Sequence, residues 1–154
     1  PISQLGEDKQ EEMSKNLERY SLYEAYEVRQ VLETKAMDLI VRNATDSDLD
    51  EIETAYQTML LRFAETNTTT GEFELHQLYA KKTGSVFMEQ TLNIVLSTIL
   101  EMMHTTSHNV MDMHQVEEEK ADHRRIIDAL HKRDSSAAQQ AMYDHIQHTL
   151  DILQ

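Results

Sequence analysis

Residues that cross-link or punctuate small proteins are scarce in this chain. Its 154 residues include no cysteine, no tryptophan, one proline and three glycines. Without cysteine there is neither a disulfide framework nor a thiolate ligand, so any metal site is limited to histidine, carboxylate and water. With so little glycine and proline, the many turns of an all-β fold lack the residues that build them. The chain is therefore predicted to be all-α.

Long apolar runs and an excess of positive charge are also lacking. No stretch approaches the length of a membrane span and no secretory signal is visible, so we expect no membrane contact and a cytoplasmic location. The formal net charge of -14 repels phosphate backbones, so this chain alone is not expected to bind nucleic acid. The length suits a single domain with a substantial core.

Apolar residues recur at helical spacing in six segments. The polar residues before Leu22 are interpreted as a connecting segment, and Thr45 with Asp48 forms a capping-box start for the second helix. The fourth segment is apolar on most sides and is predicted to be the central helix. Short loops between the helices favour an antiparallel bundle of about six helices. The predicted helices cover about 22–40, 49–63, 72–82, 86–103, 116–130 and 138–153.

Three histidines lie on the apolar stripes of three different predicted helices: His76, His123 and His145. Glu72 lies one helical turn before His76, so both side chains project from the same face. Buried imidazoles need partners, and four such groups meeting in one core are most simply satisfied by a divalent cation. These ligands suit zinc first, with nickel, manganese, cobalt and iron as alternatives.

Arg29 also falls inside an apolar stripe. A guanidinium cannot lose its charge, so it must meet a carboxylate there. Glu33, one turn further on, offers such a partner. The alternative is that Arg29 binds an anionic ligand, and an adjacent metal ion with open positions would favour a small carboxylate.

A di-iron carboxylate bundle is the main rival for a metal site inside a helical bundle. Such proteins need two Glu-x-x-His motifs, and the chain has a single match, at Glu101 and His104. We therefore do not expect a di-iron centre. The histidines expected at the surface are His104, His108, His114 and His148.

Five short stretches between about Leu22 and Leu153 form an ordered set of motifs. Three of them contain the candidate ligands, as an acid four residues before His76, an acidic residue directly before His123, and an Ala-Met pair before His145. The set resembles the FCD domain, the C-terminal effector-binding domain of GntR-type bacterial transcription regulators of the FadR subfamily. The stretches are Tyr26–Glu33, Ala44–Leu49, Glu72–His76, Asp122–Ile126 and Ala141–His145.

This resemblance implies that Glu72, His76, His123 and His145 hold one divalent ion, whose coordination an organic acid effector completes. It also implies a homodimer that contacts DNA through an N-terminal winged helix-turn-helix, for which there is no room before residue 22. Residues 1–21 are then interpreted as an interdomain linker remnant, and residues 22–154 as the effector-binding and dimerisation domain. Glu72 stands where the family usually has aspartate, and Ser85 where it often has asparagine.

The sequence is compatible with three classes of function. The first is a sensing domain that binds a sugar acid or hydroxy acid without turnover. The second is a metal-dependent enzyme, which is not expected because no further inward carboxylate or histidine is evident on the stripes to act as a general base. The third is a structural metal or dimerisation module. A closed four-ligand shell would favour it, whereas an ion holding water beside Arg29 would favour sensing.

Overall fold

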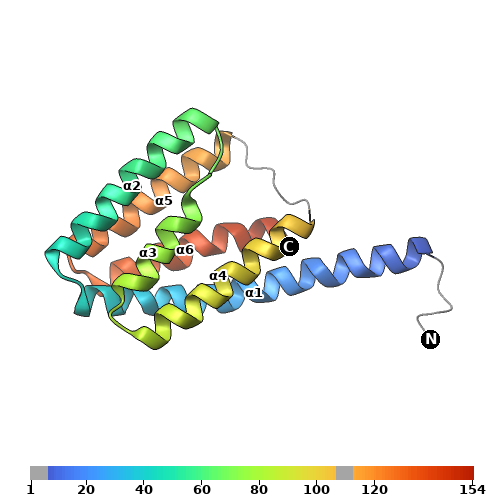
Figure 1. Ribbon diagram of the computed structural model, residues 1–154, viewed down its shortest axis with the longest axis horizontal. Helices are drawn as coiled ribbons and strands as arrows, with labels where there is room; N and C mark the ends of the chain where they lie inside the picture. Colours follow the sequence, from blue (N-terminus) through green and yellow to red (C-terminus); the bar gives the residue numbers. More distant parts are fainter. Residues whose placement is uncertain (1–6, 107–112) are drawn as a thin grey trace.

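Six helices and no strand make up the described part of the chain in this computed structural model (Figure 1). The backbone is described for residues 7–106 and 113–154, and side chains for residues 20–103 and 115–154. The predicted all-α class and the number of helices are confirmed. The helices are α1 Glu7–Asn43, α2 Asp46–Thr66, α3 Glu72–Lys82, α4 Val86–Thr106, α5 Met113–His131 and α6 Ser135–Leu153.

Local signals in the sequence fix several helix ends. The Thr45 hydroxyl accepts from the Asp48 amide while the Asp48 carboxylate accepts from the Thr45 amide, which is the predicted capping box of α2. Gly84, with φ 70°, takes the left-handed conformation after α3 that other residues adopt at a cost. The Ser85 hydroxyl then accepts from the Met88 amide at the start of α4.

The first helix begins earlier than its apolar pattern. Leu22 is buried and begins the packed part of the helix, but the α1 backbone is helical from Glu7. Figure 1 shows the N-terminal end of α1 extending beyond the ends of the other helices. Helix propensity and backbone hydrogen bonds therefore continue the helix where no apolar face is needed.

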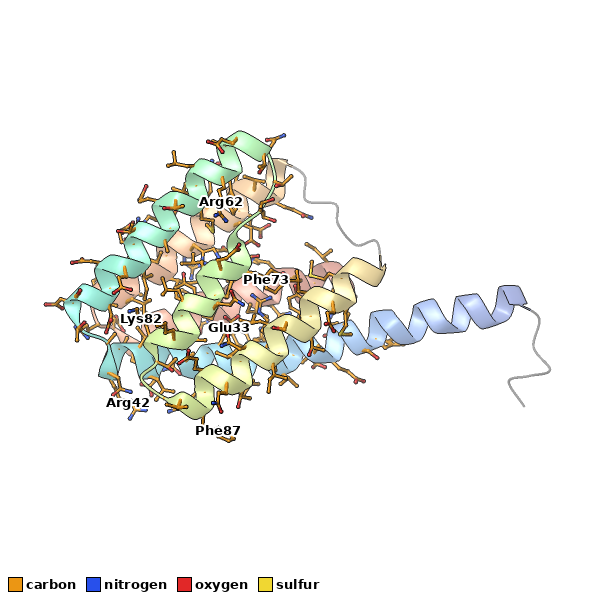
Figure 2. The ribbon with its side chains drawn as sticks, viewed as in Figure 1. Glu33, Arg42, Arg62, Phe73, Lys82 and Phe87 are labelled. Carbon is orange, nitrogen blue, oxygen red and sulfur yellow. The ribbon has the colours of Figure 1, made fainter. Side chains whose placement is uncertain are left out.

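The central helix is α1, which packs against α3, α4, α5 and α6. Among the described residues it packs most extensively against α6, which runs in the opposite direction. Gln30 of α1 crosses this interface and donates to the carbonyl of Tyr143 and the side-chain oxygen of Gln147. The prediction that the fourth helix is central is wrong. Phe87 on α4 is 81% exposed and points away from the other helices (Figure 2).

The packing of α4 explains that error. One face of α4 is buried through Leu92, Leu96 and Ile99, and it lies against α1 and α3. Ile94 on the other face is 68% exposed. Apolar residues on both sides of a helix therefore did not mean burial on both sides. The sequence pattern alone does not distinguish a helix buried on all sides from one with an exposed apolar face. No helix in the described residues is long and apolar enough to cross a membrane.

Candidate metal centre

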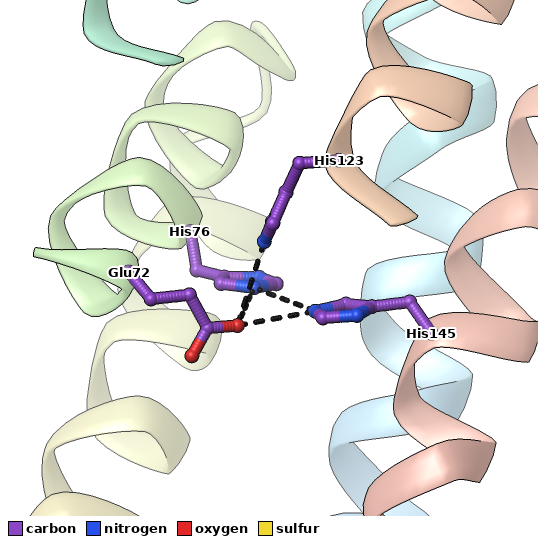
Figure 3. Close-up of side chains that lie close together, drawn as sticks. All are labelled: Glu72, His76, His123 and His145. Carbon is purple, nitrogen blue, oxygen red and sulfur yellow. Dashed lines mark hydrogen bonds and ion pairs between the residues drawn. The ribbon is translucent and has the colours of Figure 1, made fainter. Parts of the chain in front are cut away.

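Four side chains from three helices meet in the interior of the bundle (Figure 3). Glu72 and His76 lie one turn apart on α3, His123 comes from α5, and His145 comes from α6. One ligand atom from each residue lies within 4.8 Å of the others. All three imidazoles are buried, so the structure brings together the four residues that the sequence singled out as metal ligands.

The carboxylate of Glu72 is at the centre of this group. Its Oε1 lies 2.9 Å from Nε2 of His76, 3.1 Å from Nε2 of His145 and 3.5 Å from Nε2 of His123. Nε2 of His145 also lies 3.3 Å from Nε2 of His76. The same nitrogen of every imidazole therefore faces one point, beside a carboxylate oxygen.

The opposite nitrogen of each imidazole has a partner of its own. Nδ1 of His76 lies 2.5 Å from Oε1 of Glu33, and Nδ1 of His145 lies 2.9 Å from Oδ2 of Asp122. Nδ1 of His123 lies 2.9 Å from the hydroxyl of Tyr79. An ionised carboxylate only accepts hydrogen bonds, so Nδ1 of His76 and of His145 carries the proton and donates it.

These outward hydrogen bonds determine what the inward nitrogens can do. With the proton on Nδ1, the lone pair of Nε2 points at the centre of the cluster, as a metal ligand requires. The lone pairs of His76 and His145 and a carboxylate oxygen facing one another repel unless a cation or protons lie among them. Histidine held in place by a carboxylate is the usual arrangement around protein-bound metals. The four residues therefore fit one divalent ion.

The pKa shifts of His123 and His145 go in opposite directions. Burial lowers the pKa of His123 to about 3, and the nearby His145 and His76 act in the same direction. Burial acts against the charged form of His145 as well, but the carboxylates of Glu119, Asp122 and Glu72 raise its pKa well above the usual value. The carboxylates thus hold one positive charge in the cluster, and a cation can supply it in place of a proton.

Arg29 is buried, and its Nε donates to Oε2 of Glu33 at 2.8 Å. The predicted pairing of these two residues is confirmed. Burial alone would raise the pKa of Glu33, but His76 and Arg29 lower it to about 2. Glu33 therefore joins the guanidinium to the metal cluster through the two oxygens of one carboxylate.

A cavity of about 920 Å³ opens beside the cluster. Its wall includes Glu72 and His145, whereas His76 and His123 lie behind them. Arg29 lines the same cavity, as does the segment from Thr68 to Gly71 between α2 and α3. Apolar side chains of α1, α4 and α6 complete much of the wall: Leu22, Leu96, Leu100, Ile146, Ile152 and Leu153. The cavity therefore has one polar side, which contains the cluster and Arg29.

The expectation that no further carboxylate points inward is wrong. Glu33, Glu119 and Asp122 are all buried near the cluster. Glu119 precedes His123 by four residues, the same spacing as Glu72 and His76, so this acid was recognisable on the helix face of a candidate ligand. Asp122 directly precedes His123 yet pairs with His145, a contact between helices that spacing within one helix does not indicate.

The remaining histidines have mixed outcomes. The side chains of His104, His108 and His114 lie outside the described residues, as does the Glu101–His104 pair as a unit. His148 is partly buried, and its Nδ1 lies 2.9 Å from both Glu118 and Asp122. It is therefore less exposed than predicted.

Together, the bundle and its cavity define a small-molecule-binding domain with a candidate metal centre in its wall. Residues 24–148 match the model of the FCD domain. The chain therefore belongs to the FCD family, the regulatory and non-enzymatic domains of GntR-family transcription regulators. The resemblance seen in the sequence motifs is confirmed, and the enzyme alternative is excluded by membership of this family.

Solved structures share this fold. A GntR protein of Streptococcus agalactiae matches with a TM-score of 0.68 and 23% identity, over 84% of this chain and 58% of that one. E. coli McbR/YncC matches with a TM-score of 0.68 and 16% identity, over 84% of this chain and 62% of that one. This chain thus spans about three fifths of the length of both. No curated protein gives a significant match.

Proposed function

We propose that this chain is the effector-sensing domain of a GntR-type regulator and that a small carboxylate binds in its cavity beside a divalent ion. The observation that carries the proposal is the shared wall: Glu72 and His145 from the cluster line the same cavity as Arg29. A carboxylate ligand needs positive charge and a forked hydrogen-bond donor, and this wall supplies both once the ion is bound.

Arg29 is positioned for this role by its neighbours. Its one recorded hydrogen bond among the described residues uses Nε, so the two terminal nitrogens remain for a ligand. The rings of Tyr26 and Phe73 lie 5.2 Å and 5.6 Å from the guanidinium carbon. Because Glu33 and these rings fix its orientation, Arg29 loses little freedom on binding a ligand.

Glu72, His76, His123 and His145 are the residues proposed to hold the ion. When bound there, the ion supplies positive charge and open coordination positions for a carboxylate oxygen. Zinc is the first candidate from ligand type, with nickel, manganese, cobalt and iron as alternatives. Sugar acids and hydroxy acids are the proposed effectors, because their hydroxyl groups suit the polar side of the cavity and its threonines Thr68, Thr69 and Thr70.

The wider assignment concerns the protein of which this domain is part. We propose that it acts as a homodimer in the cytoplasm and contacts DNA through a winged helix-turn-helix outside this chain. Residues 1–21 would then serve as the link between the two domains. The helical α1 supports this role, because it runs continuously from Glu7 past Arg29 and Glu33, and Glu33 contacts His76 of the cluster.

A structural metal or dimerisation module without effector is the second candidate. The fully buried His76 and His123 favour it, since a closed shell of four ligands needs no access. The cavity at the wall favours sensing instead, because a purely structural ion gains nothing from an open side.

A thermal-shift screen tests the sensing proposal. Metal-loaded chain is heated with a panel of small hydroxy acids and sugar acids. A ligand at a hundred times its Kd adds about 2.7 kcal/mol to the free energy of unfolding, which raises the Tm measurably. Arg29→Lys should lose most of this shift and retain the metal, because an ammonium keeps the charge beside Glu33 but cannot make a two-pronged contact.

Arg125→Lys is the matched control, since Arg125 is exposed on α5 and pairs with Asp144 away from the cavity wall. It should respond as the wild type does. If no acid in the panel shifts the Tm of metal-loaded protein, the structural-module candidate replaces sensing. If Arg29→Lys responds like the wild type, Arg29 is not the effector contact.

A further inference from the structure

Glu119 on α5 is a buried carboxylate whose Oε2 lacks a hydrogen-bond partner. Three buried side-chain oxygens in the described residues share that lack, and the other two belong to the neutral side chains of Thr34 and Asn93. A buried charge without a partner is costly, so an unpaired carboxylate in a bundle interior calls for a ligand or a proton.

The position of this oxygen points to the cluster. Glu119 Oε2 lies 3.7 Å from Nε2 of His123 and 3.7 Å from Nε2 of His145. Two ligands of one ion lie about 3 to 4.2 Å apart, because each bond is about 2.1 Å long and the angle between bonds is 90° to 180°. Both distances fall in that range, and both involve the nitrogens that face the centre of the cluster. Glu119 lies outside the set of four residues whose ligand atoms are all within 4.8 Å of one another, so it would reach a shared ion by rotation of its side chain.

Glu119 lies on the side of the cluster that faces the cavity. It lines the cavity together with Glu72 and His145, so its carboxylate approaches the cluster from the open side. It precedes His123 by four residues on α5, just as Glu72 precedes His76 on α3. The cluster therefore has two acid–histidine pairs, each on one helix face, and a third histidine from α6.

The charges of the buried carboxylates also associate Glu119 with the cluster. Glu72 and Glu119 together carry two negative charges when ionised, and one divalent cation neutralises both. The other two carboxylates are already paired, since Glu33 meets Arg29 and Asp122 meets His145 and His148. Among the described residues, Arg29 is the one buried arginine or lysine, and its hydrogen bond goes to Glu33.

We propose that Glu119 is a fifth protein ligand of the ion, so that the centre is built from three histidines and two glutamates. This rests on the metal centre proposed above. Five protein ligands exceed the four of a tetrahedral zinc site and suit ions that take five or six ligands, such as Mn²⁺ and Co²⁺. Glu119 should therefore contribute more to the affinity for Mn²⁺ than to the affinity for Zn²⁺.

Glu119→Gln tests the assignment, because it keeps the size of the side chain and removes the charge that a ligand oxygen needs. The affinities of wild type and variant for Mn²⁺ and Zn²⁺ are measured by competition with a chelating dye. We expect the Mn²⁺ affinity to fall about a hundredfold, at the upper end of what loss of a supporting contact costs, and the Zn²⁺ affinity to fall less. Glu117→Gln is the matched control, since that side chain is 63% exposed on the same helix.

A spectroscopic readout separates a ligand from a residue that only supports the fold. Co²⁺ absorbs visible light more strongly as its coordination number falls, so Co²⁺-loaded Glu119→Gln should show stronger bands than Co²⁺-loaded wild type. Unchanged Mn²⁺ affinity and an unchanged Co²⁺ spectrum in Glu119→Gln would overturn the proposal, and the four-ligand centre would stand if His123→Ala still lost the metal. A wild type that takes up no metal would instead overturn the metal centre itself.

Discussion

Replacing Glu33 by glutamine should weaken metal binding although Glu33 is not one of the proposed ligands. The Glu33 carboxylate accepts from Nδ1 of His76 and from Nε of Arg29. Glutamine offers an amide that donates as well as accepts hydrogen bonds. The His76 tautomer with its proton on Nδ1 is then no longer favoured over the other tautomer. When the proton moves to Nε2, the nitrogen that faces the cluster has no lone pair for an ion.

The size of the effect follows from the two contacts. Loss of a carboxylate behind a ligating histidine costs about 10-fold to 100-fold in metal affinity. Removing the negative partner of the buried Arg29 costs about 3 kcal/mol or more of stability, because a guanidinium cannot be neutralised. A domain of this size has roughly 5 to 15 kcal/mol in all, so Glu33→Gln should be less stable and still folded.

Two measurements keep these effects apart. Chemical denaturation of the metal-free chain gives the stability, and competition with a chelator below the unfolding transition gives the affinity. Glu27→Gln is the matched control, since Glu27 is exposed on the same helix. The reasoning is refuted if folded Glu33→Gln binds the metal within about threefold of the wild type, because the outward carboxylate would then have no influence on His76.

Two further predictions concern protons and DNA. Loading one ion at neutral pH should release about one proton or more, because the surrounding carboxylates raise the pKa of His145 well above its usual value and the ion must displace that proton. The metal affinity should then fall by up to about tenfold for each pH unit of acidification. Calorimetry in buffers of different ionisation enthalpy measures the number of protons released. A metal affinity that does not change between about pH 6 and 8 would contradict this prediction. This chain alone should not bind duplex DNA at physiological salt, given its net charge of -14. A mobility shift at sub-micromolar protein would show that prediction to be wrong.

The fold was largely predictable because it depends on signals within single segments. The capping box at Thr45 and Asp48, the glycine at position 84 and the stripes of α2 and α6 all act over one or two turns. The place of α4 in the bundle was not predictable in this way. Which of its two apolar faces is covered depends on α1 and α3, and a helix does not carry that information in its own sequence.

In the candidate site too, residues recognisable within a single helix were predicted, and contacts between helices were not. The three histidines and Glu72 were found because each lies on an inward stripe, and one pair shares a helix face. The outward partners Glu33 and Asp122 were not recognised as such, because their contacts join α1 to α3 and α5 to α6. Acidic residues are common in this chain, so an acid near a histidine in sequence is a weak signal until the helices are placed.

Elemental analysis of the chain purified without a chelator tests the central claim most directly. The account predicts about one divalent ion per chain in the wild type and loss of that ion in His123→Ala and in His145→Ala, since each variant removes one inward-facing nitrogen. A wild type that is free of metal and cannot be loaded, or histidine variants that retain the ion fully, would contradict it.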